Sequence, residues 1–333
     1  MIYTQTPFRL SFFGGGTDHQ PFFNEHGGCV LSTTINKYCY TSLRRCPPFF
    51  DYHTRVRYSR TEDVRKTEEL VHPLVRNCMM HMGVHNLSII HEADLPARSG
   101  LGSSSSFAVG LLQALNAFKG KYASKQQLAE DAIYVERELC NESGGWQDQV
   151  AVAYGGFNRI DFYSDSFSVS PIVITSGRKK ELEEHLMMFF TGISRFSDVA
   201  ASAQMAAIGD NVSQLLEMKS LVNDAIKIIG CGSDIVEFGK LLDYTWKLKR
   251  GLSDSISSDY IDEIYTKAKN AGAIGGKLMG AGGGGFMVLF VAPDNQASVR
   301  EALHDFVYVP FEFEEDGSKI IHYTQEEYEY YTE

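Results

Sequence analysis

The sequence predicts an α+β protein of two parts, because a strand-rich region precedes a helix-rich region along its 333 residues. Its length corresponds to about two domains at roughly 150 residues per domain. Strand-like runs dominate the first third, whereas residues 198–270 have mainly helical periodicity. A polar stretch at 176–180 is the expected boundary, which gives domains of residues 1–176 and 177–333.

The first half alternates β-prone runs with amphipathic segments. Apolar residues at helical spacing predict helices over 68–82 and Ser103–Phe118. Ser124, followed three residues later by Gln127, is a capping-box pattern that predicts the start of a third helix. Strands are expected at 8–13, 29–35, 37–44, 86–91, Phe157–Phe162 and 167–174.

The second half is expected to open with a strand over 185–191 and to return to a strand at 286–292, after a glycine-dense loop. The acidic and tyrosine-rich tail at 326–331 is expected to be a solvated surface segment. The sequence shows no internal repeat and no heptad array.

Composition and charge exclude several classes of protein. A net charge of −11 and a pI near 5.4 disfavour a nucleic-acid partner or an acidic membrane surface, and no local basic patch offsets them. The N-terminal residues do not resemble a signal peptide, and the longest apolar run, 286–292, is too short to span a bilayer. Six cysteines without a Cys-x-x-Cys pair indicate reduced thiols. We therefore expect a cytoplasmic protein.

Three glycine-rich clusters, at 14–18, 96–106 and 277–285, carry the main chemical signal. Gly100 and Gly102 lead directly into the helix expected at Ser103, where free N–H groups and the helix dipole favour a bound anion. The four serines that follow can cap this helix or reach a metal ion. Taken alone, the cluster is better explained as an N-cap beside a flexible turn.

Familiar nucleotide-binding motifs do not fit these glycines. Gly280, Gly282 and Gly285 match the dinucleotide-binding spacing, but a strand follows them where that motif requires a helix. Lys277 is followed by Leu278 where a P-loop has Ser or Thr, and no protein-kinase catalytic loop is present. The clusters therefore predict a phosphate site of another kind.

Two carboxylates are candidates for chemistry. Asp148 lies near a predicted helix N-terminus, where it is either a cap or a catalytic base. Glu136, with a serine hydroxyl, can supply the sparse oxygen ligation of a phosphate-bound Mg²⁺, although an exposed ion pair with Arg137 is the alternative. His81 and His85 have the spacing of a zinc pair, and we interpret them as helix-surface residues.

The three clusters, in this order, resemble the GHMP kinases, the family of galactokinase, homoserine kinase and mevalonate kinase. The resemblance implies a two-domain α+β fold with the active site in the interdomain cleft, and ATP and Mg²⁺ as cofactors. It implies that Ser104 and Glu136 bind Mg²⁺, that Asp148 orients or deprotonates a sugar hydroxyl, and that Arg9 faces the transferring phosphoryl group. The implied ATP-binding residues are Pro96, Ser99, Gly100, Leu101, Gly102, Ser103, Ser104, Ser105 and Ser106.

Within the family, the segments at 17–18 and 146–149 resemble the branch that phosphorylates sugars at C1. Gly15 and Gly16 replace the Glu-His pair of galactokinases, which argues against galactose. The implied acceptor is D-glycero-α-D-manno-heptose 7-phosphate, converted to the 1,7-bisphosphate for surface polysaccharide. The implied substrate-binding residues are Gly14, Gly15, Gly16, Thr17, Asp18, Gly144, Gly145, Asp148, Gly280 and Gly282.

A phosphorylated acceptor requires a second anion site. The candidate residues are Arg44, Arg45, Arg55, Arg57 and Lys179. A fucose or other hexose 1-kinase is the alternative enzyme, and a catalytically silent sugar-binding regulator is the alternative outside catalysis. The expected partner is a small-molecule sugar phosphate, and the expected state is a monomer or a homodimer.

Overall fold

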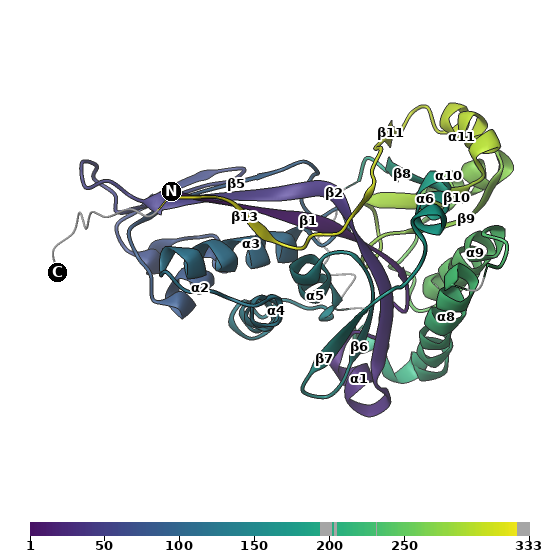
Figure 1. The fold of residues 1–333 in the computed structure, drawn as a ribbon, viewed down its shortest axis with the longest axis horizontal. Helices are drawn as coiled ribbons and strands as arrows, with labels where there is room; N and C mark the ends of the chain where they lie inside the picture. The colour runs from purple at the N-terminus through teal and green to yellow at the C-terminus, as the bar shows by residue number, and fades with distance from the viewer. Residues whose placement is uncertain (194–201, 203–204, 231, 325–333) are drawn as a thin grey trace.

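The described residues of a computed structural model, 1–193, 202, 205–230 and 232–324, form two sheets with helices packed against them (Figure 1). This mixed architecture confirms the predicted α+β class. The acidic tail at 326–331 lies outside the described residues.

The first half is built on a nine-stranded sheet with the order β13-β1-β2-β5-β3-β4, in which β6 and β12 also pair with β2, and β7 pairs with β6. Only the β3–β5 pairing is parallel. Its strands are β1 (Ile2–Phe13), β2 (Gly28–Arg45), β3 (Thr54–Arg57), β4 (Thr61–Val64), β5 (Leu87–Ala93), β6 (Phe157–Phe162), β7 (Phe167–Pro171), β12 (Phe313–Glu314) and β13 (Lys319–Tyr323).

The two strands predicted at 29–35 and 37–44 are one continuous strand, β2. Pro7 pairs with Tyr38 and the next residue, Phe8, pairs with Ile35, so Asn36 and Lys37 are extra residues opposite β1. The polar break in the sequence is therefore a β-bulge inside a strand rather than the end of one.

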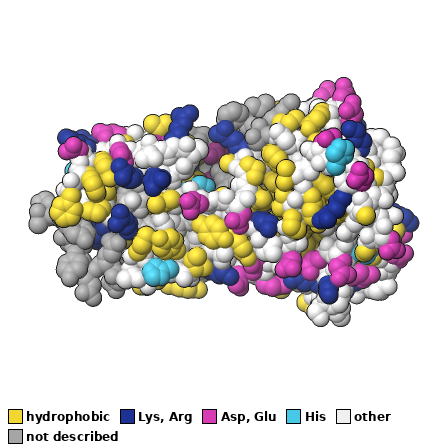
Figure 2. All heavy atoms as spheres, turned by 90° about the horizontal axis from the view of Figure 1, so that it is seen from above, with side chains coloured by type: hydrophobic (Ala, Val, Ile, Leu, Met, Phe, Trp, Pro, Cys, Tyr) yellow, Lys and Arg dark blue, Asp and Glu magenta, His cyan; other side chains and the backbone are white. Residues whose placement is uncertain are grey.

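Helices cover one face of this sheet, below it in Figure 1, and the long helix α3 packs on β1 and β2. The opposite face carries half-buried tyrosines such as Tyr3 and Tyr40, and Figure 2 shows hydrophobic and charged side chains interspersed across the molecule from that side. The helices of this half are α1 (Gln20–His26), α2 (Pro73–Met82), α3 (Ser103–Phe118), α4 (Lys125–Tyr134) and α5 (Gln147–Tyr154), with a 3₁₀ turn at Thr67–Glu69 and a π-turn at Val135–Leu139.

Several predicted elements in this half agree closely with the structure. Helix α3 and strand β6 have the predicted bounds. Ser124 caps α4, because its hydroxyl accepts a hydrogen bond from the amide of Gln127. The helix predicted over 68–82 begins only at Pro73, whose ring suits the first turn of a helix.

The second half contains an antiparallel four-stranded sheet with the order β11-β8-β10-β9. Helix α9 packs on β9 and against α8. The strands are β8 (Leu186–Phe190), β9 (Ala273–Leu278), β10 (Phe286–Val291) and β11 (Val307–Tyr308); the helices are α6 (Ser176–Glu184), α8 (Val212–Gly230), α9 (Val236–Arg250), α10 (Asp259–Asn270) and α11 (Gln296–Ala302), with 3₁₀ turns at Gly209–Asn211 and Pro293–Asn295.

The two halves share a hydrophobic core where β1 reaches the second sheet. The rings of Phe12 and Phe13 lie 5.6 and 5.1 Å from that of Phe238 on α9, both in edge-on contact. Because interior packing resists displacement, this contact fixes the end of β1 relative to α9.

The polar stretch at 176–180 forms the first turns of α6, an element that the sequence did not predict. Thr175 caps this helix, and Arg178 donates to the carbonyl of Ile228 at the end of α8, at 2.9 Å. The domain boundary at residue 176 stays a prediction. Strands β12 and β13, which come late in the chain, belong to the sheet of the first half. No helix among the described residues combines the length and apolarity needed to cross a membrane.

Candidate functional site

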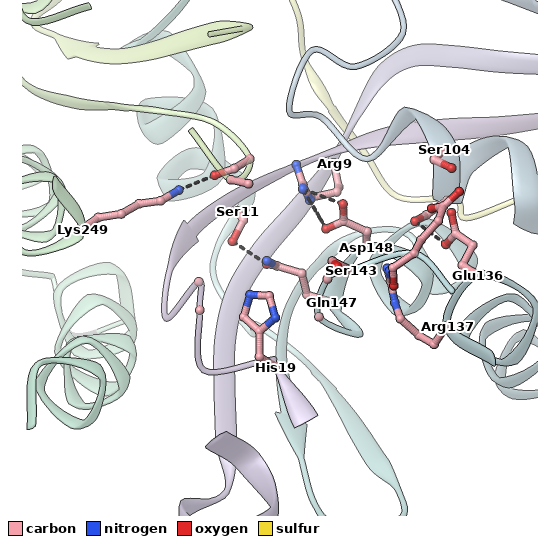
Figure 3. Close-up of a pocket in the computed structure, with 18 of the residues that line it drawn as sticks. Arg9, Ser11, His19, Ser104, Glu136, Arg137, Ser143, Gln147, Asp148 and Lys249 are labelled. Carbon is pink, nitrogen blue, oxygen red and sulfur yellow. Dashed lines mark hydrogen bonds and ion pairs between the residues drawn. The ribbon is translucent and has the colours of Figure 1, made fainter. Parts of the chain in front are cut away.

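A cavity of about 120 Å³ lies between the two halves, lined by residues of β1, α3, α5, α9 and β9 (Figure 3). Ten of the predicted site residues line it: Arg9, Gly15, Gly16, Ser104, Ser105, Glu136, Gly144, Gly145, Asp148 and Gly280. The others stand behind its wall or outside it: Gly14, Thr17, Asp18, Pro96, Ser99, Gly100, Leu101, Gly102, Ser103, Ser106 and Gly282.

Arg9 and Asp148, which both line the cavity, form an ion pair (Figure 3). Nε and Nη2 of Arg9 each donate to one carboxylate oxygen of Asp148 at 2.8 Å, and Nη1 donates to the carbonyl of Gly100 at 2.6 Å. Arg9 is 3% exposed and Asp148 is 24% exposed. The two-point contact fixes the carboxylate while leaving part of it accessible from the cavity.

The N-terminus of α3 provides an anion site on one side of this pair. Gly102 is its N-cap, with φ of +78°, and has no side chain that can cap the first turn. The opening N–H groups of a helix have no partner within the helix, so they remain for a ligand beside Ser104 and Ser105 in the cavity wall.

Glu136 is fully buried, so the alternative of an exposed ion pair is wrong. Its Oε2 accepts hydrogen bonds from Ser105 Oγ, at 2.8 Å, and from Gln149 Nε2. Among the described residues no donor reaches Oε1. A buried carboxylate oxygen without a donor fits a cation in the cavity, and a magnesium ion there would take its other ligands from phosphate and water.

The serine bound to Glu136 is Ser105, whereas Ser104, the serine predicted to bind the metal with Glu136, is exposed in the same turn. The described residues contain no cluster of three or more His, Cys, Asp or Glu side chains that is able to hold a metal. A metal at Glu136 therefore depends on a bound nucleotide for most of its ligands.

Asp18 links the first glycine cluster to α5. Its carboxylate accepts from the amide of Gly16 at 2.9 Å and from that of Gln147 at 3.4 Å, and it is 1% exposed. A Cβ on Gly145 would lie 1.9 Å from Asp18 Oδ2, so only glycine fits there. These contacts hold the wall of the cavity together, and a direct contact of Asp18 with a sugar stays a prediction.

The third glycine cluster, at 277–285, packs against the second, at 96–106. A Cβ on Gly100 would lie 2.3 Å from the carbonyl oxygen of Met279, and one on Gly280 would lie 2.4 Å from the Cα of Gly100. Backbone from the two halves therefore meets at the α3 loop, and Gly280 also lines the cavity. Gly282 instead packs on Ile256, outside it.

We expect Gly100→Ala to lower stability by roughly 3 kcal/mol, since it combines a positive φ with a backbone clash. Gly120→Ala is the matched control, because Gly120 has φ of +65° and open space around it, and we expect a loss of about 1 kcal/mol. Urea unfolding of both variants measures the difference. Equal losses of unfolding free energy in the two variants would show that the close contact between Gly100 and the Met279 carbonyl does not limit the residue at position 100.

The cavity is also lined by basic residues that were not predicted from the sequence. Lys249 on α9 is 5% exposed, and burial, reinforced by the charge of Arg9, lowers its pKa to about 8. Lys277 on β9 donates to the carbonyls of Ser11 and Phe12 at 2.9 and 3.1 Å, and burial holds its pKa well below its usual range. No local sequence signal distinguishes Lys249 from a surface lysine.

His19 is a further buried residue in the wall, 5% exposed. Burial lowers its pKa, and among the described residues Nδ1 has no hydrogen-bond partner. By contrast, the residues predicted for a second anion site do not line the cavity. They are Arg44, Arg45, Arg55, Arg57 and Lys179.

Comparison with known families gives two matches. The GHMP kinases N-terminal domain matches residues 69–156, and the GHMP kinases C-terminal domain matches residues 218–309. Both ranges contain residues of the cavity, namely the α3 turn in the first and α9 and β9 in the second.

Among curated relatives, a D-glycero-alpha-D-manno-heptose 7-phosphate kinase of Campylobacter jejuni is 30% identical over 338 residues, covering 96% of this chain and 98% of the relative. An L-fucokinase/L-fucose-1-P guanylyltransferase of Bacteroides fragilis is 26% identical, covering 90% of this chain and 35% of that longer protein.

Solved structures agree with the fold. A D-glycero-D-manno-heptose 1-phosphate kinase from Bacteroides thetaiotaomicron superposes with a TM-score of 0.78 at 24% identity, covering 98% of this chain and 100% of that one. A Lactococcus lactis galactokinase complexed with galactose superposes with a TM-score of 0.73 at 16% identity, covering 96% and 94%.

Proposed function

Because this chain belongs to the GHMP kinase family, we propose that it is an ATP-dependent sugar 1-kinase acting on D-glycero-α-D-manno-heptose 7-phosphate. Its product is the 1,7-bisphosphate. The observation that carries this proposal is the near full-length match, at 30% identity, to a heptose 7-phosphate kinase. The Arg9–Asp148 pair beside the α3 N-terminus gives that reaction a site with suitable chemistry.

In this proposal the phosphates of ATP lie at the first turn of α3, next to Ser104 and Ser105. Glu136 Oε1 and the serine hydroxyls would hold Mg²⁺ together with the phosphates, and the bound ion would supply positive charge beside the transferring group. The buried and unpartnered Oε1 supports this assignment. Glu136 is kept in place by Ser105 and Gln149.

Asp148 accepts a hydrogen bond from the anomeric hydroxyl and takes its proton as the sugar oxygen bonds to the γ-phosphorus. The bond from the γ-phosphorus to the bridging oxygen breaks, and ADP leaves. Arg9 keeps Asp148 in position and places a fixed positive charge beside the transferring phosphoryl group. Phosphoryl transfer needs this kind of positioning and charge stabilisation more than covalent help.

We expect Glu136→Gln to raise the Mg²⁺ concentration needed for half-maximal rate by about 10- to 100-fold, since second-sphere changes alone cost that much and a ligand is lost here. Initial rates at fixed ATP and increasing Mg²⁺ measure this. Glu142→Gln, which changes another carboxylate that lines the same cavity, is the control. An unchanged Mg²⁺ dependence of Glu136→Gln would remove Glu136 from the metal site.

The proposal is tested by ADP release with Mg·ATP and a panel of acceptors: heptose 7-phosphate, the same heptose without phosphate, mannose, fucose and galactose. Turnover of heptose 7-phosphate without turnover of the hexoses supports it. A preference for fucose would support the second candidate, a fucose 1-kinase, which the 26% match to a fucokinase favours. No turnover with any sugar would favour a silent sugar-binding regulator.

The proposal includes the setting of the reaction. The enzyme acts in the cytoplasm as a monomer or homodimer, on small molecules and without a nucleic-acid or membrane partner. Its product feeds the formation of nucleotide-activated heptose for surface polysaccharide. Light scattering after size exclusion measures the oligomeric state.

A further inference from the structure

Lys249 is a buried cation in the wall of the cavity. It lies in the last turn of α9, is 5% exposed, and donates to the carbonyl of Gly280. Among the described residues no carboxylate forms an ion pair with it. An ammonium group has three N–H donors, so two remain for a ligand. A buried charge without a counter-ion is unfavourable, and an anion in the cavity would relieve that cost.

The nearest carboxylates are already bound by other groups. Arg9 binds both oxygens of Asp148, and the amides of Gly16 and Gln147 bind Asp18. Both carboxylates favour the charged form of Lys249 from a distance, but burial and the charge of Arg9 outweigh them, and its pKa falls to about 8. The ammonium is therefore not neutralised within the protein.

The position of Lys249 shows which ligand it faces. In Figure 3, Lys249 lies on one side of the Arg9–Asp148 pair, and Ser104 and Glu136 lie on the other. Since the phosphates of ATP are proposed to lie at Ser104, the space on the side of Lys249 belongs to the acceptor. An anion bound there is part of the acceptor sugar.

His19 adds a second polar group on the same side. It is 5% exposed and lines the cavity, and Nδ1 has no partner among the described residues. It comes from the loop before α1, whereas Lys249 comes from α9. Two buried polar groups from different halves thus face one cavity, each with unused hydrogen-bonding capacity.

We propose that Lys249 binds the phosphate that the acceptor sugar already carries, with His19 as a second hydrogen-bonding group beside it. This inference rests on the proposed sugar-kinase function and defines the acceptor as a sugar phosphomonoester. It replaces the surface residues expected from the sequence. Arg55, for example, is bound to Asp63 on β4, and Lys179 is bound to Glu315.

The test compares Lys249→Met with Lys249→Arg and with Lys247→Met. Lys247 is the matched control, because it lies on the same helix, is 66% exposed and pairs with Asp243 away from the cavity. Initial rates are measured with heptose 7-phosphate and with the same heptose lacking the phosphate. Binding of heptose 7-phosphate to enzyme loaded with Mg²⁺ and a non-hydrolysable ATP analogue is measured by calorimetry.

We expect Lys249→Met to raise KM for heptose 7-phosphate by roughly 10- to 100-fold, with kcat and KM for ATP within about threefold, since a hydrogen bond to a charged group is lost. KM for the unphosphorylated heptose stays within about threefold, so the preference for the phosphorylated sugar is lost. Lys249→Arg retains most of the preference because it keeps the charge, and Lys247→Met behaves as wild type.

The pH profile gives a second readout. For wild type, kcat/KM for heptose 7-phosphate falls above pH 8, because the ammonium loses its proton near its pKa of about 8 and no longer attracts phosphate. This fall is absent with the unphosphorylated heptose and absent in Lys249→Met. The charged groups that face Lys249 are Arg9, Asp18, His19, Asp148 and Lys277.

Several results would overturn the inference while leaving the kinase intact. One is equal binding of heptose 7-phosphate to wild type and Lys249→Met. Another is a loss confined to kcat, which would place Lys249 at the transferring phosphoryl group. A third is wild-type preference for an unphosphorylated sugar. If wild type turns over no sugar and binds no heptose 7-phosphate, the proposed function fails together with the inference.

Discussion

Replacing Asp148 by Asn is expected to lower kcat by about 10²- to 10⁴-fold, because the variant cannot accept the proton of the anomeric hydroxyl. Asn keeps one carbonyl oxygen, so it retains a hydrogen bond from Arg9 and much of the local geometry. KM for ATP is expected to change little, since Asp148 belongs to α5 and is not one of the α3 residues proposed to bind the phosphates. Steady-state ADP release, together with a thermal melt, measures both quantities.

Asp63→Asn is the matched control for this variant. Asp63 forms the same kind of two-point contact, with Arg55, at 2.7 and 2.8 Å, but on the exposed β3–β4 hairpin outside the cavity. We expect its turnover to equal that of wild type. If Asp148→Asn melts normally and keeps the wild-type kcat, then Asp148 is not the base.

Replacing Arg9 by Met is expected to lower kcat by about 10²- to 10³-fold, the usual effect of removing one group that stabilises developing charge. Arg9→Lys is expected to recover only part of this loss, because an ammonium cannot contact both oxygens of Asp148 and the carbonyl of Gly100 in one plane. Arg55→Met is the matched control.

The double variant distinguishes the roles of the pair. Arg9 acts partly by holding Asp148 in position. The fold-loss of kcat in the double variant Arg9→Met/Asp148→Asn is therefore expected to be smaller than the product of the two single fold-losses. A fold-loss of kcat in the double variant equal to the product of the two single fold-losses would mean that Arg9 does not position Asp148. A rise in KM for the acceptor without a fall in kcat would make Arg9 a ground-state binding residue instead.

The sequence predicts the parts of the fold whose patterns are local. Helix α3 has twelve buried residues among sixteen, so its apolar run defines both of its ends. Strand β9 was not predicted, because Gly275 and Gly276 leave no β-like pattern. A Cβ on Gly275 would lie 1.9 Å from the carbonyl oxygen of Gly239 on α9, so close packing dictates glycine in this strand.

Helix α6 was missed for a related reason. Leu182 is its buried residue, so it has no apolar stripe, and Arg178 attaches it to the end of α8. Such an element depends on a partner that lies 50 residues away in the chain. Periodicity within the segment therefore contains no sign of it.

The candidate site likewise contains residues that local motifs predict and a residue that only the tertiary packing places there. Arg9 and Asp148 belong to motifs that the sequence displays, and the structure brings them together across 139 residues. Lys249 lies in a Lys-Leu-Lys-Arg run that has the composition of an exposed helix end. Only the packing of α9 against β9 and β1 buries its side chain in the cavity, and no local pattern encodes that contact.

The return of the chain to its first sheet affects how the protein is made. Strand β13 pairs with β1 along the sheet edge, β12 pairs with β2, and the amino group of Met1 donates to the carbonyl of Thr324 at 2.6 Å. During synthesis the ribosome delivers residues 313–323 after all the other strands of this sheet. The sheet that carries Arg9 therefore keeps an open edge until β12 and β13 have been synthesised and can pair with β2 and β1.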